Sequence, residues 1–488
     1  MGRRVVNRSI RLVGFGVVVL MLALVAQLSY VQLVRAKALN ADPNNFRVSR
    51  HDFVHARGNI LTSDGKVIAL SKRVPDDLKY LRVYPYKGLY AQVTGFESLL
   101  YGATGVESSY NSALLGHDLS TVQSLLHPNT TENVRTSIDS RAQQAAADGL
   151  ANRRGSVVVL DAQTGGIVAM FSNPNYDPND LSTHDPAHAR SVFEADQRNP
   201  ANPMLARTYR ELYPPGSTFK IVTATTGLRT GVVNLLSPFP VVRSIPLPQT
   251  NGRTLSNFGH ELCGGTLVES FAQSCNTSFG KLALDIGDAL TDGAHDFGFG
   301  TPPPPLDLAP AMVESQGPNT ARGDFAHNEP AFMLDAIGQN DIVTTPLQMA
   351  LTAEAVATGG RILVPHVLQD IETNTGDVTR RAATTTWRTV MPQPIATELN
   401  SMMVQVVNDG TGTPAKVPEF QIAGKTGTAE TGVPGEQPHA WFVGFAPAAH
   451  PRYVVAVLVE HGGNPNSEVT GGAIAAPIAR QVLQALLG

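Results

Sequence analysis

The sequence predicts an α+β domain built around an antiparallel sheet that unites distant parts of the chain. Two short apolar runs flank a glycine-containing turn, a pattern typical of two antiparallel strands. Similar runs recur near the C-terminal end, followed by a segment with apolar residues at helical spacing. Together with helical patterns between the two ends, these runs predict a sheet covered by helices. The expected strands are 156–160, 166–170, 440–445 and 453–459, and the expected helices include 141–150, 348–358 and 473–487.

The composition is that of a globular protein and excludes a nucleic-acid role. With 488 residues, 42% hydrophobic and 16% charged, the chain can bury one large core or two moderate ones. Its formal net charge is only -4, and the sequence has no dense Lys/Arg block beyond its first eleven residues. Because binding to nucleic acid needs a basic patch, we expect no nucleic-acid partner.

The N-terminal segment predicts a membrane anchor. Residues 12–34 are apolar with only scattered polar side chains, as in a membrane-spanning helix. Four arginines lie in the preceding tail, 1–11, so the N-terminus is expected in the cytoplasm and the rest outside the cytoplasmic membrane. The alternative is a cleaved signal peptide, because residues 36–38 have the small-x-small form of a cleavage site. The long apolar run and the charges around that site favour a retained anchor, and both interpretations export the bulk of the chain.

The exported part is expected to contain two domains. Residues 35–132 hold short apolar stretches broken by Pro, Gly and Ser, with a turn signal at 63–66. They predict a small β-rich module rather than a second catalytic unit. The α+β domain then occupies residues 133–488.

The chain has only two cysteines, Cys263 and Cys275, twelve positions apart. In an exported protein they can form a disulfide, but two small buried thiols fit the sequence equally well. No Cys/His cluster has the spacing of metal ligands, so we expect no metal and no cofactor.

A first candidate for chemistry is Ser217 with Lys220. A Pro-Pro-Gly sequence precedes the serine and an apolar stretch follows it, so Ser217 is expected near a helix N-terminus. The two side chains, three residues apart, then share one helical face. Free N–H groups of the first turn can stabilise an oxyanion, and a desolvated Lys220 can act as a base. Taken alone, Ser-x-x-Lys is more often an ordinary polar helix surface.

A second candidate pair is Ser274 with Asn276. If the backbone is extended, both side chains point to one side and Cys275 points away. The hydroxyl can then relay a proton and the amide can bind a peptide carbonyl. In isolation, an ordinary polar loop is the favoured interpretation of this tripeptide.

The third candidate is the predicted strand 422–430, which contains Lys425, Thr426, Gly427 and Thr428. An edge strand of this kind can pair with an extended peptide substrate. Lys425 can attract a C-terminal carboxylate and depress the pKa of Lys220, and the Thr428 N–H can help to hold an oxyanion.

Together, in this order and at these separations, the three motifs resemble the active-site set of the penicillin-recognising serine enzymes. Segments outside the motifs are similar to class B penicillin-binding proteins, most of all to the actinobacterial penicillin-binding protein A group. Asn340 stands where this family's pattern has glycine, and this departure affects only the expected shape of the loop at 338–340. The segments outside the motifs that carry the resemblance are 57–60, 338–340, 345–350 and 439–447.

The resemblance implies the penicillin-binding transpeptidase fold, with a helical subdomain and an N-terminal dimerisation or pedestal module. It further implies that Ser217 is acylated by D-Ala-D-Ala stem peptides of peptidoglycan and by β-lactam antibiotics, and that an amine of a neighbouring stem takes the acyl group. A separate glycan polymerase is an expected partner, because too little sequence precedes Asn133 for a polymerase domain. The resemblance implies catalytic roles for Ser217, Lys220, Ser274 and Lys425, and substrate-binding roles for Asn276, Thr426, Gly427 and Thr428.

Three alternatives share these residues. A β-lactamase or β-lactam sensor can carry the same motifs, although the sequence lacks the Glu-x-x-Leu-Asn element of class A lactamases. A scaffold would use the anchor and the module without catalysis, which the full set of reactive side chains disfavours. A carboxypeptidase would pass the acyl group to water, and the sequence leaves the acceptor open, as it does the choice between elongation and division.

Overall fold

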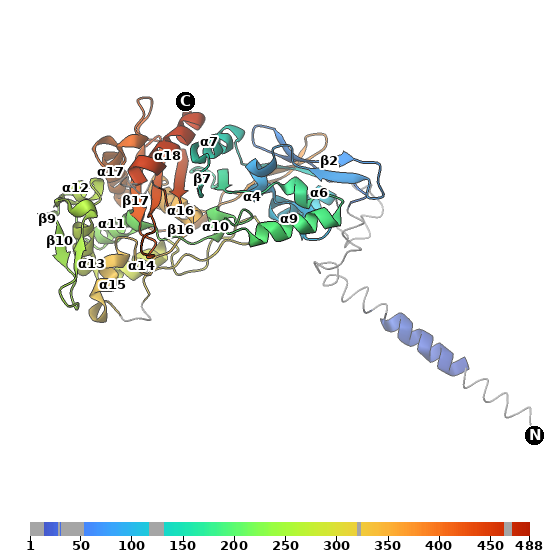
Figure 1. The fold of residues 1–488 in the computed structure, drawn as a ribbon, viewed down its shortest axis with the longest axis horizontal. Coiled ribbons are helices and arrows are strands. Elements are labelled where there is room, and N and C mark those ends of the chain that lie inside the picture. The colour runs from blue at the N-terminus through green and yellow to red at the C-terminus, as the bar shows by residue number, and fades with distance from the viewer. Residues whose placement is uncertain (1–13, 28–29, 31–52, 117–130, 320–323, 463–470) are drawn as a thin grey trace, which may run out of the picture.

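The computed structural model describes residues 14–27, 30, 53–116, 131–319, 324–462 and 471–488. A larger C-terminal domain and a smaller N-terminal part lie side by side in an elongated molecule (Figure 1). The larger domain is built on an antiparallel sheet with strand order β17-β18-β19-β7-β8. These strands are β7 (Gly155–Asp161), β8 (Ile167–Asn173), β17 (Ala423–Ala429), β18 (His439–Ala446) and β19 (Tyr453–Val459).

Strand β19 joins the two ends of the chain, as the sequence predicts. It pairs on one side with β18 and on the other with β7, where Val457 lies opposite Val157. All four predicted strands are therefore confirmed as neighbours in one α+β sheet. Among the described residues, β17 pairs only with β18, so it forms an edge of this sheet.

Different helices cover the two faces of the sheet, because successive side chains of a strand point to opposite faces. Val157 and Val159 of β7 belong to the apolar core that contains α7 and α18. Val158 and Leu160 join the other core, which contains α11 and α16. The helices of this domain are α7 (Ser140–Leu150), α8 (Pro178–Leu181), α9 (Pro186–Arg198), α10 (Arg207–Arg210), η3 (Gly216–Phe219), α11 (Lys220–Arg229), η4 (Phe258–His260), α12 (Leu267–Ala272), α13 (Asn276–Ile286), α14 (Ala289–Asp296), η6 (Phe325–His327), α15 (Glu329–Asp335), α16 (Pro346–Ala357), α17 (Gln393–Asp409), η7 (Thr413–Ala415) and α18 (Gly471–Leu487).

Short two-stranded sheets lie next to the helices. Strand β9 pairs with β12, β10 with β11, and β13 with β16, each antiparallel. The first two pairs lie beside α12 and α13, at the end of the molecule far from the N-terminal part (Figure 1). Their bounds are β9 (Pro238–Val242), β10 (Ser244–Pro246), β11 (Thr254–Ser256), β12 (Cys263–Thr266), β13 (Arg361–Leu363) and β16 (Thr386–Thr389).

The N-terminal part contains a second sheet, with strand order β15-β14-β6-β1-β2-β3. Two of its strands come from beyond residue 360, and the predicted domain boundary at 132/133 lies at the start of β6. Strand β6 pairs with β1 on one side and with β14 on the other. The elements here are β1 (Ile60–Leu61), β2 (Val67–Arg73), β3 (Tyr80–Val83), η1 (Lys87–Tyr90), α4 (Ala91–Thr94), β4 (Glu97–Ser98), β5 (Gly102–Ala103), α5 (Gly105–Ser109), α6 (Asn111–Leu115), β6 (Glu132–Thr136), β14 (Leu368–Thr373) and β15 (Val378–Arg381).

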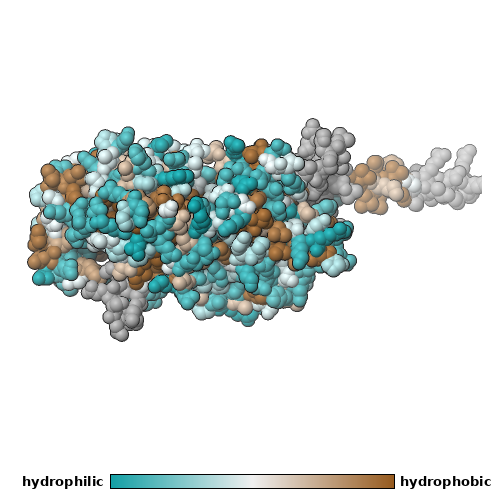
Figure 2. All heavy atoms as spheres, turned by 90° about the horizontal axis from the view of Figure 1, so that it is seen from above, coloured by the Kyte–Doolittle hydropathy of each residue, from teal (hydrophilic) through white to brown (hydrophobic). Residues whose placement is uncertain are grey.

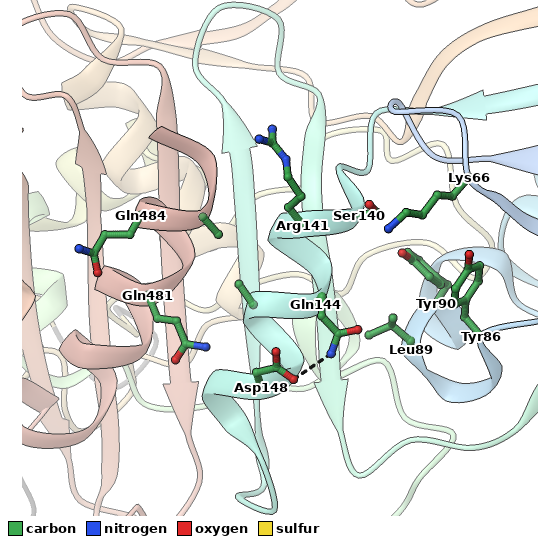
Figure 3. A pocket seen from close by; sticks show the side chains of 12 residues that line it. Lys66, Tyr86, Leu89, Tyr90, Ser140, Arg141, Gln144, Asp148, Gln481 and Gln484 are labelled. Carbon is green, nitrogen blue, oxygen red and sulfur yellow. Dashed lines mark hydrogen bonds between the residues drawn. The ribbon is translucent and has the colours of Figure 1, made fainter. Parts of the chain in front are cut away.

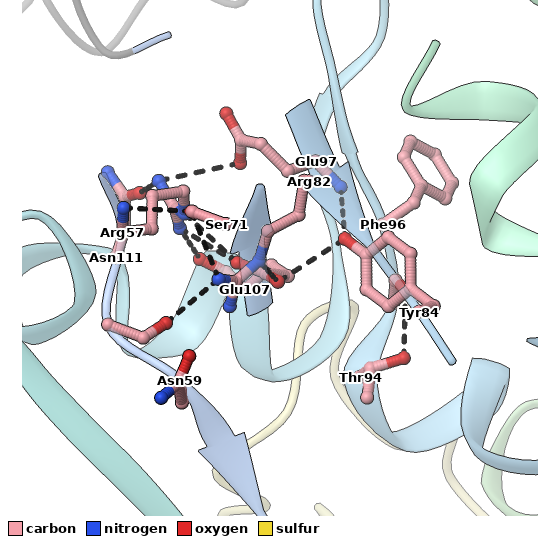
Figure 4. A network of polar contacts seen from close by, with 12 residues as sticks. Arg57, Asn59, Ser71, Arg82, Tyr84, Thr94, Phe96, Glu97, Glu107 and Asn111 are labelled. Carbon is pink, nitrogen blue, oxygen red and sulfur yellow. Dashed lines mark hydrogen bonds and ion pairs between the residues drawn. The ribbon is translucent and has the colours of Figure 1, made fainter. Parts of the chain in front are cut away.

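A buried ion network ties the N-terminal part together (Figure 4). Glu107 is fully buried and accepts hydrogen bonds from Arg82 Nε at 2.6 Å and from Arg57 Nε at 3.1 Å. Tyr84 donates to the same carboxylate at 3.2 Å. Burial alone would raise the pKa of Glu107, but the charges of Arg82 and Arg57 outweigh it and hold that pKa below its usual value.

We therefore expect Glu107→Ala to lower the free energy of unfolding by about 3–5 kcal/mol, because two buried guanidinium groups lose the carboxylate that they share. Thermal and urea unfolding measure this change. Glu194→Ala is the matched control, since Glu194 forms an exposed i,i+4 pair with Arg198 and should contribute less than about 1 kcal/mol. Equal stability of the two variants would contradict a structural role for the network.

A groove of about 630 Å³ lies where the N-terminal part meets the larger domain (Figure 3). Tyr86 and Tyr90, in and next to η1, line one side, and Gln144 of α7 and Gln484 of α18 line the other. The two parts contact each other here through η1 and α7, where Gln143 Nε2 donates to the Leu89 carbonyl at 2.8 Å.

Residues 14–27 form a helix whose side chains are exposed, including Phe15 and Leu20. Figure 2 shows this helix as a largely hydrophobic segment, in contrast to the mostly hydrophilic surface of the body. No helix within the described residues is both long and apolar enough to cross a bilayer. The predicted span 12–34 and the tail 1–11 reach outside the described residues.

Candidate active site

Ser217 lies in η3, directly before α11, so the predicted position at a helix N-terminus is confirmed. Ser217 is partly exposed and Lys220 is fully buried. We call residues 214–217 the serine turn. It packs tightly against β17: a Cβ atom on Gly216 would lie 2.7 Å from the Thr428 carbonyl oxygen, and one on Gly427 would lie 2.8 Å from the Pro215 carbonyl oxygen. Glycine at both positions allows this close approach.

Lys220 connects the serine turn with the second motif. Its Nζ donates hydrogen bonds to the Ser274 carbonyl at 2.7 Å and to Asn276 Oδ1 at 2.8 Å. A longer contact, 3.4 Å, reaches Ser274 Oγ. No hydrogen bond joins the Lys220 amine to the Ser217 hydroxyl in the described part of the chain. The structure therefore brings Lys220 of the first motif together with both residues of the second motif.

The backbone of the second motif differs from the prediction. We expected Ser274 and Asn276 in extended conformation, but Ser274 has a left-handed φ of 62° and Asn276 is the first residue of α13. The tripeptide is the turn between α12 and α13, closed by a hydrogen bond from the Cys275 N–H to the Ser270 carbonyl. The prediction was wrong because the alternation rule holds only within a strand. Both side chains nevertheless reach Lys220 through this turn.

Lys425 of the third motif reaches the same serine from β17. Its Nζ donates to Ser274 Oγ at 2.8 Å and to the Thr426 carbonyl at 3.0 Å. The Nζ atoms of two lysines therefore converge on one hydroxyl. The rings of Phe271 and Phe279 lie within 6 Å of these groups, Phe271 at 5.6 Å from Lys425 Nζ and Phe279 at 5.3 Å from Lys220 Nζ, and help to exclude water.

Burial lowers the pKa of both lysines, and the charge of Lys425 lowers the pKa of Lys220 further. Lys220 is fully enclosed, and burial together with the charge of Lys425 brings its pKa well below the usual value. Burial lowers the pKa of Lys425 to about 7. A proton on one amine disfavours a proton on the other, so near neutral pH the arrangement favours a neutral Lys220 beside a partly protonated Lys425.

The two threonines of the third motif form hydrogen bonds with residues of other elements. Thr426 Oγ1 lies 2.5 Å from Thr411 Oγ1, and Thr428 Oγ1 accepts a hydrogen bond from the Gly471 N–H at 3.3 Å. Gly471 begins α18, so this helix and the loop after α17 fix the two threonine hydroxyls. Neither Thr411 nor Gly471 has a sequence signal that links it to the motif.

The two cysteines form a disulfide, which decides between the alternatives that the sequence left open. Cys263 begins β12, and Cys275 lies between Ser274 and Asn276. The bond therefore ties the second motif to the neighbouring β9–β12 pair.

We expect the double variant Cys263→Ser/Cys275→Ser to unfold at lower temperature. The disulfide restricts the unfolded chain, and closing a loop of this length stabilises the folded state by about 3 kcal/mol. We also expect acylation by penicillin to slow severalfold, since Ser274 and Asn276 lose an anchor. A digest without reductant should keep the peptides of Cys263 and Cys275 linked. Free thiols in the protein purified without reductant, or a variant with unchanged melting and acylation, would contradict this role.

The loop at 338–340 supports the serine turn from the other side. The Gly216 N–H donates to the Gly338 carbonyl at 2.9 Å. Asn340 adopts a left-handed φ of 61°, and its side chain donates to Asp335 at 3.1 Å. Asparagine tolerates this conformation better than other residues with a side chain. The loop therefore keeps a backbone that suits glycine.

Residues that no motif indicated also surround the serine turn. Tyr213 donates its hydroxyl to Glu460 at 2.7 Å, and Arg207 pairs with the same carboxylate at 2.7 Å. Trp441 donates its indole N–H to the Pro214 carbonyl at 3.0 Å. Sequence analysis missed Tyr213, Glu460 and Arg207, because their contacts join positions more than two hundred residues apart.

Known sequences and structures match the chain along nearly its whole length. Residues 155–484 match the family Penicillin binding protein transpeptidase domain, and residues 57–136 match Penicillin binding protein A dimerisation domain. A relative from Mycolicibacterium smegmatis, named peptidoglycan D,D-transpeptidase PbpA, is 40% identical over 99% of both chains. A relative of the same name from Mycobacterium tuberculosis is 37% identical, again over 99% of both.

Solved structures agree with this result. The ceftriaxone acyl-enzyme complex of penicillin-binding protein A from M. tuberculosis superposes with a TM-score of 0.82 at 34% identity, over 90% of this chain and 100% of that one. The penicillin G acyl-enzyme complex of the same protein gives 0.80 at 35% identity, over 89% and 100%. These matches confirm the penicillin-binding transpeptidase fold and the resemblance drawn from the motifs. The chain belongs to the penicillin-binding protein transpeptidase family.

Proposed function

We propose that this protein is a peptidoglycan D,D-transpeptidase that forms an acyl-enzyme at Ser217. The observation that carries the proposal is the convergence of Lys220 and Lys425 on Ser274, directly behind the serine turn. This arrangement supplies a neutral amine, a cation and a proton-relaying hydroxyl near one partly exposed serine. Acyl transfer from an anionic peptide requires these groups.

In the first half-reaction Ser217 Oγ attacks the carbonyl carbon between the two D-Ala residues of a stem peptide. Neutral Lys220 takes the serine proton, and the N–H groups of Ser217 and Thr428 stabilise the oxyanion. Ser274, in contact with both lysines, relays a proton to the departing amine of the terminal D-Ala. An amine of a neighbouring stem then attacks the ester, forms the cross-link and returns the proton to Ser217.

The third motif and Asn276 bind the substrate. Lys425 supplies positive potential for the terminal carboxylate. Because Thr428 Oγ1 already accepts the Gly471 N–H, its own hydrogen remains available to donate to that carboxylate. Gly427 lets the serine turn lie close to edge strand β17, and its backbone contacts the substrate along that edge. Thr426 and the Asn276 amide bind polar groups of the peptide. The acyl-enzyme structures of the M. tuberculosis relative support acylation by β-lactams.

The proposal extends to the domains and the location. Residues 1–11 form a cytoplasmic tail and 12–34 a single-pass anchor in the cytoplasmic membrane. Residues 35–132 form a dimerisation or pedestal module, and 133–488 the extracytoplasmic transpeptidase domain. The exposed apolar helix 14–27 supports the anchor, and protease added to spheroplasts should digest the C-terminal domain. A separate glycan polymerase supplies the strands to be cross-linked.

A donor peptide ending in D-Ala-D-Ala, offered together with a stem peptide that has a free side-chain amine, tests the reaction. A transpeptidase releases D-Ala and yields the amide-linked dimer, whereas a carboxypeptidase releases D-Ala and yields only the shortened acid. Hydrolysis alone at saturating acceptor would replace the transpeptidase proposal by the carboxypeptidase one. Absence of D-Ala release would overturn both.

A further inference from the structure

The serine turn depends on its neighbours for its position. Pro214 and Pro215 have no N–H to donate, so half of the turn cannot form backbone hydrogen bonds as a donor. Immediately before it, Tyr213 and Thr344 exchange two backbone hydrogen bonds of 2.8 and 2.9 Å. Tyr213 is therefore the last residue before the two prolines that is anchored to a neighbouring element through its backbone N–H.

The side chain of Tyr213 is held as firmly as its backbone. It is 5% exposed, and its hydroxyl donates to Glu460 Oε1 at 2.7 Å. Its ring meets His439 edge-on at 5.4 Å and Trp441 at 6.4 Å between centroids. Trp441 is the residue whose indole also holds the Pro214 carbonyl. Burial and the charge of Glu460 raise the pKa of Tyr213, so the hydroxyl keeps its proton and remains a donor.

Glu460 has enough partners without the tyrosine. Arg207 Nε lies 2.7 Å from its Oε1, and Arg154 Nε lies 3.0 Å from its Oε2. Arg207 is buried and also donates to two carbonyls before α10, those of Ala201 and Asn202. Burial would raise the pKa of Glu460, but the bonds from Tyr213 and Arg207 outweigh it, so the group is ionised.

The Tyr213 hydroxyl has two possible roles: it can stabilise the Glu460–Arg207 ion pair, or it can fix the placement of Tyr213. Without it, the carboxylate of Glu460 would still be paired with two guanidinium groups, so the fold would lose only one hydrogen bond. Tyr213 itself would lose the hydrogen bond to Glu460 that fixes the end of its side chain. The hydroxyl therefore matters more for the placement of Tyr213, and of the serine turn that follows, than for the ion pair.

We propose that Tyr213 is a positioning residue for acylation. Held by its hydrogen bond to the Glu460–Arg207 pair, Tyr213 sets the placement of the Ser217 hydroxyl relative to the Lys220 amine. The proposal rests on Ser217 as the acylated nucleophile. Near-attack geometry is demanding, because a misplacement of about 1 Å can slow a reaction about a hundredfold. A relaxed serine turn should slow the chemical step while leaving initial binding of the ligand intact.

The test compares Tyr213→Phe with the wild-type protein, with penicillin G as the probe and rapid-quench intact mass as the readout. We expect the limiting acylation rate to fall about tenfold, with an unchanged dissociation constant for the initial complex and an unchanged melting temperature. Tyr209→Phe is the control, because Tyr209 is a neighbouring buried tyrosine outside the network. It should acylate like the wild type.

A second variant tests whether the effect of Tyr213→Phe acts through the hydrogen bond to Glu460 or through a local change at Tyr213. Glu460→Gln removes the charge that anchors Tyr213, and it should also slow the limiting rate. Combined with Tyr213→Phe it should add little, because both changes act through the same bond. A Tyr213→Phe rate within about twofold of wild type, a loss confined to binding or melting temperature, or losses that multiply in the double variant would each overturn the proposal. If the wild-type protein forms no adduct at all, the proposed function fails instead.

Discussion

Lys220→Ala is expected to slow acylation by penicillin by about three orders of magnitude, the middle of the range for loss of a general base. Lys220 is fully buried, its pKa is lowered by burial and by Lys425, and its amine is held by Ser274 and Asn276. Without this amine nothing takes the proton from the Ser217 hydroxyl. The second-order rate constant of acylation measures the effect.

Two further variants separate a base from a simple positive charge. Lys220→Arg places a permanent positive charge at this position and cannot lose its proton, so it should not support acylation. Lys281→Ala is the matched control, because Lys281 lies on α13 with an exposed pair to Asp285 and should leave the rate unchanged. Acylation of Lys220→Ala at the rate of the Lys281→Ala control would remove Lys220 from the mechanism.

Lys425→Ala is expected to lower the same rate constant about a hundredfold, equivalent to about 3 kcal/mol of transition-state stabilisation. The variant loses the cation for the substrate carboxylate and the charge that keeps Lys220 neutral. The fold should stay intact, because a lysine amine with a pKa of about 7 is already costly to charge in its buried position.

The pH dependence provides an independent check on Lys425. As the pH rises through about 7, Lys425 loses its proton, so acylation of the wild type should decline on the alkaline side. On the acidic side it should decline as Lys220 gains a proton. Lys425→Arg should retain its charge and move the alkaline decline upward. A wild-type rate that keeps rising well above pH 7, or an unchanged rate in Lys425→Ala, would contradict this role.

The sequence predicted the central sheet and the set of candidate side chains, because both depend on local patterns. Apolar runs such as 453–459 read as strands whatever they pair with, and Ser217 follows a recognisable Pro-Pro-Gly start of a helix. The backbone conformation of Ser274 could not be predicted in this way. Its left-handed turn is set by the packing of α12 against α13 and by the disulfide, and neither leaves a periodic signal.

Long-range pairings were beyond sequence analysis for a similar reason. Strand β14 extends the N-terminal sheet although it lies more than two hundred residues away from β6. Glu460 meets Tyr213 across 247 positions. Nothing in the local composition of either partner indicates the other, because such contacts follow from how the whole chain packs.

The intact mass of the protein during incubation with penicillin tests the central claim most directly. The sequence shows no Glu-x-x-Leu-Asn element, so Ser217 should hold the drug as one long-lived covalent adduct, and Ser217→Ala should form none while remaining folded. Turnover of many equivalents of penicillin would contradict the account in favour of a lactamase, and an adduct that persists in Ser217→Ala would show that another residue is the nucleophile.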